Sequence, residues 1–165
     1  MANPNWCSPP WIVAPIRAFG RGVIDLDPCA NAASIVGALT EWSGQPSGLV
    51  ENWGDGMRRG GVAYSNPPYT RGVIDAWAAK LQLEGGLAIL GDWHSIALLP
   101  LRTSAHWWQY SIMPSWQACC FPAKRITFNG APSAVPWESV LVYWGSDALR
   151  FQRQFEPLGW VERRR

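Results

Sequence analysis

Residues 62–70 read VAYSNPPYT, and this stretch decides the fold. Its first four residues form an apolar run of strand length, and the two prolines that follow end the strand because proline has no N–H to donate to a neighbouring strand. After Thr70, apolar residues recur at helical spacing as far as Leu81, and Gly85-Gly86 is the predicted end of that helix. The stretch therefore predicts a strand, a rigid turn and an amphipathic helix in succession.

On either side of this unit, the chain alternates between predicted strands and helices. The apolar run at residues 87–90 predicts a parallel strand that is covered on both faces. Residues 22–26 predict a buried strand that ends at Asp27-Pro28, and residues 31–42 predict a helix. Strands followed by helices favour right-handed crossovers within one sheet.

The C-terminal third has a different pattern. A helix is predicted at residues 103–112, and strand-like runs at 119–121, 125–128 and 140–144 indicate a hairpin-like region. The complete order of elements predicts an α/β fold whose sheet is parallel in the centre and antiparallel at one edge.

Composition limits the classes of protein that fit. A chain of 165 residues matches a single domain, and 48% apolar residues with only 16% charged residues exclude disorder. The four cysteines have no C-x-x-C spacing and only two histidines are present, so neither a metal site nor a disulfide framework is predicted. No apolar stretch approaches a membrane-spanning length, so we expect no membrane segment and a cytoplasmic location.

The residues that follow the strand at 62–65 suggest a chemistry. Ligands of open α/β sheets bind beyond the carboxyl ends of the strands. There, the side-chain carbonyl of Asn66 and the backbone carbonyl of Pro67 can accept hydrogen bonds from a ring-bound amine, which frees the nitrogen lone pair to attack a sulfonium methyl. Proline holds such a turn rigid, and the ring of Tyr69 can stack on a base flipped from a duplex. Asn66, Pro67, Pro68 and Tyr69 are the predicted catalytic residues, although the same tetrapeptide in isolation also fits a structural proline turn.

Short segments along the whole chain add to this pattern. In order, they are Trp6-Cys7-Ser8-Pro9, Leu26-Asp27-Pro28-Cys29-Ala30-Asn31, Asn52-Trp53, Asn66-Pro67-Pro68-Tyr69, Leu99-Pro100-Leu101-Arg102-Thr103, Trp107-Trp108, Arg125-Ile126-Thr127-Phe128 and Val140-Leu141-Val142-Tyr143-Trp144. Together they resemble the phage-type Dam family of DNA adenine-N6 methyltransferases over nearly the full length. The resemblance implies a compact Rossmann-like methyltransferase sheet, shortened relative to the full fold, that takes a methyl group from S-adenosylmethionine.

The resemblance also implies where the cofactor binds. Ser8-Pro9 resembles the segment near its methionine end, residues 27–31 resemble its main binding turn, and residues 52–53 would lie near its adenosine. The acidic residue on the ribose is left open among Asp27, Glu51 and Asp55, with Asp27 first. The residues predicted to bind the cofactor are Ser8, Pro9, Asp25, Asp27, Pro28, Cys29, Asn31, Asn52 and Trp53.

The sequence departs from the wider methyltransferase pattern in two ways. The turn at 27–31 has no glycines, and only about forty residues separate it from Asn66, which is too few for every usual intermediate element. No room remains for a separate target-recognition domain in a single domain of residues 1–165. DNA contacts are therefore expected from loops, with Arg71, Arg102 and Arg125 on phosphates, or from a second subunit, which leaves a homodimer open.

Other functions stay open at this point. The tetrapeptide activates planar amines in general, so the target could instead be cytosine N4, an RNA amine or a protein glutamine. A catalytically inactive, nucleic-acid-binding relative would keep the fold and lose the cofactor. The net charge of +2 neither indicates nor excludes nucleic acid, although 12 of the 14 basic residues are arginines, which grip phosphates and stack on bases.

Overall fold

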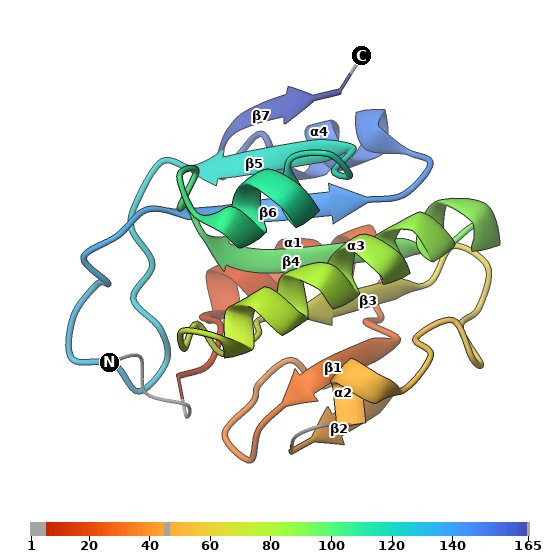
Figure 1. Cartoon of the computed structure of the whole chain (residues 1–165), viewed down its shortest axis with the longest axis horizontal. Coiled ribbons are helices and arrows are strands. Elements are labelled where there is room, and N and C mark those ends of the chain that lie inside the picture. The colour runs from red at the N-terminus through yellow and green to blue at the C-terminus, as the bar shows by residue number, and fades with distance from the viewer. Residues whose placement is uncertain (1–5, 45–46, 165) are drawn as a thin grey trace.

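The computed structural model describes residues 6–44 and 47–164. Its strands form one seven-stranded sheet in the order β2-β1-β3-β4-β6-β5-β7 (Figure 1). In chain order the elements are α1 (Pro10–Phe19), β1 (Leu26–Ala30), β2 (Thr40–Ser43), α2 (Ser47–Val50), β3 (Val62–Ser65), α3 (Val73–Gly91), β4 (His94–Pro100), the π-helical turn η1 (Trp108–Ile112), β5 (Ala118–Pro122), β6 (Ser139–Trp144), α4 (Ala148–Phe155) and β7 (Gly159–Arg163).

The sheet has a parallel half and an antiparallel half. Strands β2, β1, β3 and β4 run parallel to one another, whereas β6 is antiparallel to β4, β5 to β6, and β7 to β5. This confirms the predicted α/β class with a parallel centre and an antiparallel edge, and the arrangement is compatible with a Rossmann-like fold. The carboxyl ends of β1, β3, β4 and β5 all lie at one edge of the sheet, which we call the C-terminal edge.

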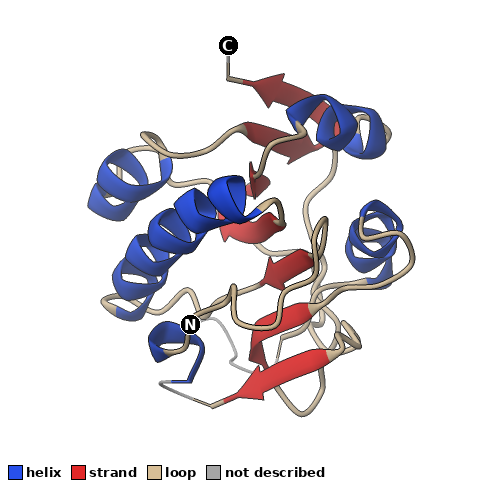
Figure 2. Cartoon of the chain, turned by 90° about the vertical axis from the view of Figure 1, so that its right-hand side faces the viewer, coloured by secondary structure: helices blue, strands red, loops and turns tan. Residues whose placement is uncertain are grey.

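Helices cover both faces of the sheet. Helix α3 crosses the front with η1 and α2, and α1 and α4 lie behind (Figures 1 and 2). Side chains alternate between the two cores, so that Tyr64 of β3 faces α1 while Ala63 faces α3. Because both faces are covered, every residue of β4 and of β6 is buried, which explains their mainly apolar sequences.

Helix α3 is longer than predicted, and the predicted strand at residues 87–90 is wrong. The helix continues through Gly85-Gly86 to Gly91 and ends at Asp92, whose φ of 55° is left-handed. Gly85 serves close packing, because a Cβ at this position would lie 2.5 Å from the ring of Trp144. Residues 87–90 are therefore the last turn of the helix, and the parallel strand is β4.

Three other predicted elements differ from the structure. Residues 31–42 form no helix: a turn at residues 32–33 leads into irregular chain, and the last residues pair as β2 with β1. Strand β1 lies four residues later than predicted and includes Pro28, where a register shift between Asp27 and Ala30 accommodates the missing N–H. The segment 125–128 is no strand of the sheet, and next to it only the isolated bridge between Cys7 and Asn129 is formed among the described residues.

Candidate functional site

A cleft opens at the C-terminal edge between the ends of β1 and β3. Its volume is about 250 Å³, including space open to solvent. It joins the turn after Asp27 to Asn66, so it brings together residues from the predicted cofactor set and the predicted catalytic set. The residues that line it are Trp6, Cys7, Ser8, Asp27, Cys29, Asn31, Ser34, Val36 and Asn66.

Asp27 is the only carboxylate in the cleft lining, and it is 4% exposed. Its Oδ1 accepts a hydrogen bond from the Cys29 backbone N–H at 3.1 Å, and the Ser34 hydroxyl lies 3.5 Å from Oδ2. The pKa of Asp27 is raised to about 6, mainly by burial and to a smaller extent by the charge of Glu41, while hydrogen bonds from Cys29 and Ser34 act to lower it. Among the described residues no lysine or arginine lines the cleft, so this part of the chain presents a desolvated negative charge without a paired cation.

The wall opposite Asp27 comes from the start of α1. The Ser8 hydroxyl lies 2.6 Å from the Tyr64 hydroxyl, which ties this segment to β3. Pro9 is buried and precedes the first residue of α1. The Cys7 thiol donates to the Asn31 side-chain oxygen at 3.2 Å, which links this wall to the turn after β1. The predicted residues Ser8 and Asn31 thus face one cleft from two elements.

The Asn66-Pro67-Pro68-Tyr69 turn follows directly on β3. Pro67 is buried, whereas Asn66 is half-buried and reaches the cleft. The Tyr69 hydroxyl lies 2.7 Å from Asn66 Oδ1 and 2.8 Å from the carbonyl oxygen of Leu98 in β4. The Tyr69 ring itself is absent from the cleft lining and packs edge-on against Phe128 at 6.3 Å.

The aromatic ring that does line the cleft belongs to Trp6. It stacks on Phe128 with ring centroids 5.9 Å apart and an interplanar angle of 13°. Sequence reasoning included Trp6 in a motif but assigned it no place in the site. Its role depends on the loop that carries Phe128, which is more than a hundred residues away along the chain, so no local pattern could reveal it.

A second hollow of about 260 Å³ lies along β1 on the α3 side and contains other residues of the predicted cofactor set. Asp25 lines it, but both carboxylate oxygens are occupied: Arg58 Nε lies 2.6 Å from Oδ1, and the Val62 backbone N–H donates to Oδ2 at 2.8 Å. Trp53 is 1% exposed, and its Nε1 donates to the Gly48 carbonyl at 2.8 Å. Asp25 and Trp53 thus have structural contacts away from the cleft.

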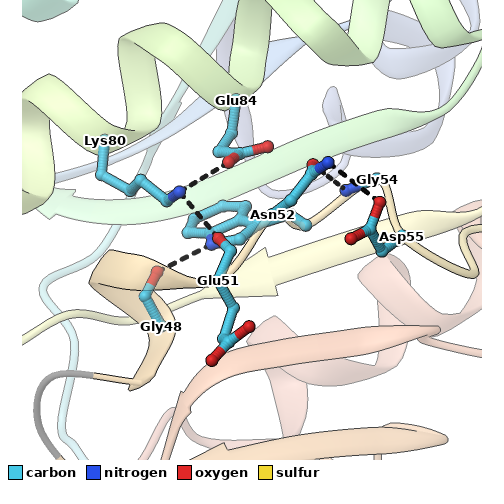
Figure 3. Close-up of polar contacts among 8 residues, drawn as sticks. Gly48, Glu51, Asn52, Gly54, Asp55, Lys80 and Glu84 are labelled. Carbon is cyan, nitrogen blue, oxygen red and sulfur yellow. Dashed lines mark hydrogen bonds and ion pairs between the residues drawn. The ribbon is translucent and has the colours of Figure 1, made fainter.

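Residues 51–55 are anchored to α3, as Figure 3 shows. Lys80 Nζ donates to the Glu51 carbonyl at 2.7 Å and forms an ion pair with Glu84 at 2.7 Å. The Asn52 side chain bonds to Asp55 at 2.9 Å and accepts from the Gly54 N–H at 3.1 Å. Asn52 and Asp55 therefore cap their own loop, and neither lines the cleft with Asp27.

The three predicted DNA-contacting arginines are exposed at the C-terminal edge. Arg71 follows the Asn66 turn, Arg102 follows β4, and Arg125 follows β5. Arg125 pairs with Glu138 at 2.9 Å, whereas Arg71 and Arg102 have no ion pair within residues 6–44 and 47–164. Lys124 lies beside Arg125, with its Nζ 4.5 Å from the Trp11 ring centroid. This edge thus carries exposed cations, whereas none of the described residues that line the cleft is basic.

Comparisons with protein-family models, curated proteins and solved structures found no match to this chain. Within the described residues, no group of three or more histidine, cysteine, aspartate or glutamate side chains is placed to hold a metal ion. None of the described helices has both the length and the apolar character needed to cross a membrane.

Proposed function

We propose that this protein transfers a methyl group from S-adenosylmethionine to the N6 amine of adenine in DNA. The observation that carries the proposal is the cleft at the C-terminal edge, where Asp27 and Asn66 line one space. Ligands of open α/β sheets bind at this position. Had the Asn66 side chain been turned into the protein interior, away from Asp27, the proposed chemistry would have had no place.

The cleft lining fits the chemistry of this cofactor. S-adenosylmethionine carries a sulfonium, an ammonium group and ribose hydroxyls but no phosphate. A buried carboxylate with hydroxyl and amide neighbours and no basic side chain suits such a cation, whereas a dinucleotide would call for donors to its phosphates. Asp27 would bind a ribose hydroxyl or the ammonium group, with Ser8 and Asn31 as hydrogen-bonding neighbours. When bound, the cofactor supplies an electrophilic methyl group.

The protein's own task is to prepare the amine. Asn66 Oδ1 and the Pro67 carbonyl accept hydrogen bonds from the two amine hydrogens, so the nitrogen lone pair leaves conjugation with the ring and points at the methyl carbon. A bound S-adenosylmethionine would supply the methyl group and leave as S-adenosylhomocysteine, and the methylated nitrogen would release one proton to water. Trp6, whose ring lines the cleft, offers a stacking surface for the flipped base.

The surrounding cations fit a DNA substrate. Arg71, Arg102 and Arg125 lie at the same edge as Asn66, where they can contact phosphates on either side of the target base. Such contacts position the duplex without reading its sequence. The cleft itself has no cation, so the phosphate backbone is expected to bind around the opening and the base to enter it.

The test is methyl transfer from labelled cofactor to plasmid DNA, followed by nucleoside analysis, which separates N6-methyladenine from N4-methylcytosine. We expect Asn66→Ala to lower the rate by about a hundredfold, since it removes one of two amine acceptors, while calorimetry shows unchanged binding of S-adenosylhomocysteine. Gln154→Ala, which removes an amide from α4 outside the cleft lining, is the matched control. Wild-type protein that labels no nucleoside would refute the proposal, and so would full activity of Asn66→Ala.

A further inference from the structure

The Tyr69 hydroxyl lies between two oxygen atoms but has only one proton. Asn66 Oδ1 is 2.7 Å away and the Leu98 carbonyl oxygen is 2.8 Å away. Both atoms are hydrogen-bond acceptors, so a single hydroxyl proton can serve only one of them fully. Burial raises the pKa of Tyr69 well above its usual value, so the hydroxyl keeps its proton throughout the physiological range.

The Leu98 carbonyl oxygen is the preferred acceptor of this proton. The last pair of the β3–β4 ladder is Ser65 with Ala97, and the next backbone nitrogens after Asn66 belong to Pro67 and Pro68, which have no N–H. The Tyr69 hydroxyl therefore replaces the backbone donor that the prolines cannot supply. A buried carbonyl without a donor is costly, and a backbone carbonyl cannot turn away.

The Asn66 carboxamide, in contrast, can turn. A half-turn about its Cβ–Cγ bond exchanges Oδ1 and Nδ2, which differ little in size. Nδ2 then donates to the Tyr69 oxygen, Tyr69 donates to Leu98, and each group in the chain has a matching partner. The same half-turn releases Oδ1 from Tyr69, and Asn66 is the residue of this turn that lines the cleft.

We propose that Tyr69 is a positioning residue whose hydroxyl fixes the Asn66 carboxamide with its oxygen facing the cleft. The inference rests on the proposed function, which needs that oxygen as an acceptor for the amine. It gives Tyr69 a different task from stacking on the base: its ring packs against Phe128, and the ring that lines the cleft is that of Trp6. The prolines and the tyrosine then act together. Because the prolines provide no N–H, the Tyr69 hydroxyl donates its proton to the Leu98 carbonyl of β4.

Tyr69→Phe tests the inference because it keeps the ring and removes only the hydroxyl. If the hydroxyl positions Asn66, kcat falls by about tenfold or more while the KM for DNA and the affinity for S-adenosylhomocysteine stay within about twofold. In an Asn66→Ala background the same substitution causes no further loss, since its effect passes through Asn66. Tyr110→Phe, which removes the hydroxyl of an exposed tyrosine in η1, is the control.

A wild-type kcat in Tyr69→Phe would overturn the inference, as would losses that multiply in the double variant. A second readout does not depend on activity: the side-chain amide resonances of Asn66 in a ¹⁵N NMR spectrum, identified by their absence from Asn66→Ala. Tyr69→Phe should shift them and speed their exchange with water, and unchanged resonances would refute the positioning role. If wild-type protein methylates nothing, the proposed function fails and these resonances alone decide the inference.

Discussion

Asp25 and Asp27 are two residues apart at the start of β1, yet they meet opposite environments. Asp25 is 9% exposed, pairs with Arg58 and accepts the Val62 N–H. Asp27 is 4% exposed and has no lysine or arginine partner among the described residues, and burial raises its pKa to about 6. The Asp25 carboxylate thus stabilises the fold through its partners, whereas the Asp27 carboxylate is buried beside a cleft, where its charged form is unfavourable.

The difference shows which buried charge marks a site. A paired carboxylate joins elements and stabilises them, whereas an unpaired one lowers stability and persists where a function requires it. The sequence alone does not reveal this difference, because Arg58 lies 33 residues after Asp25 in the chain, with β2 and α2 in between. The same amide substitution at the two positions should therefore have opposite effects.

Asp25→Asn should produce the larger change, a loss of about 2 to 3 kcal/mol in the free energy of unfolding. Each oxygen of Asp25 accepts from a different donor, so an amide must place its NH₂ group against either Arg58 or the Val62 N–H. Arg58 is 41% exposed and can turn to water, so the main cost lies at the buried backbone donor. Urea unfolding at pH 7.5 measures it. An unchanged midpoint would show that the contacts of the Asp25 carboxylate do not stabilise the fold.

Asp27→Asn should instead stabilise the unliganded protein at pH 7.5 by about 1 to 2 kcal/mol. The folded-state pKa of about 6 lies above the ordinary aspartate pKa of 3.8, so the folded state binds the proton more tightly. The resulting stability is present at low pH and is lost as pH rises through 6. The amide carries no charge, keeps an acceptor for the Cys29 N–H and can donate to Ser34. Urea unfolding at pH 5 and pH 7.5 should show a pH-dependent loss in wild type that shrinks in the variant.

The affinity for the cofactor should change in the opposite direction to the stability. In Asp27→Asn the affinity for S-adenosylmethionine should fall by about tenfold, because the variant lacks the charge that the cation meets. In wild type the same affinity should weaken below pH 6, as Asp27 becomes protonated. Calorimetry at pH 5.5 and 7.5 measures both. A variant that is less stable than wild type, yet binds the cofactor normally, would place Asp27 with Asp25 as a structural residue.

In the parallel half of the sheet, β3 is the strand that could be predicted from sequence with its correct bounds. The apolar run and the two prolines of residues 62–68 predicted β3 and its end, and the structure confirms both. Ligands of open α/β sheets bind at the carboxyl ends of the strands, and one cleft at these ends contains both Asp27 and Asn66. These features depend on local backbone chemistry, which the sequence records directly.

The errors arose where a distant partner decides the structure. Gly85 was predicted to end a helix, but the ring of Trp144 occupies the space that a side chain would need. The segment 31–42 has spacing that is also compatible with a helix, but β1 offers an edge that its last residues pair with as β2. The stacking of Trp6 on Phe128 and the pairing of Asp25 with Arg58 likewise need tertiary contacts.

The comparison between paired and unpaired charges extends to the cations at the C-terminal edge, where we expect the smallest effects. Arg102 has no ion pair among the described residues, whereas the Arg125 guanidinium already binds Glu138. Arg102→Ala should weaken DNA binding by about two- to fivefold and lower the slope of log affinity against log salt by about one. The reason is that Arg102 can contact a phosphate without first breaking an ion pair within the protein. Arg125→Ala should change the slope less, since its charge is partly neutralised. Fluorescence anisotropy with a labelled duplex over a range of salt concentrations measures both slopes. A larger change of slope for Arg125→Ala would mean that DNA displaces Glu138 from Arg125. Ion pairing in the free protein would then not predict which arginines bind DNA.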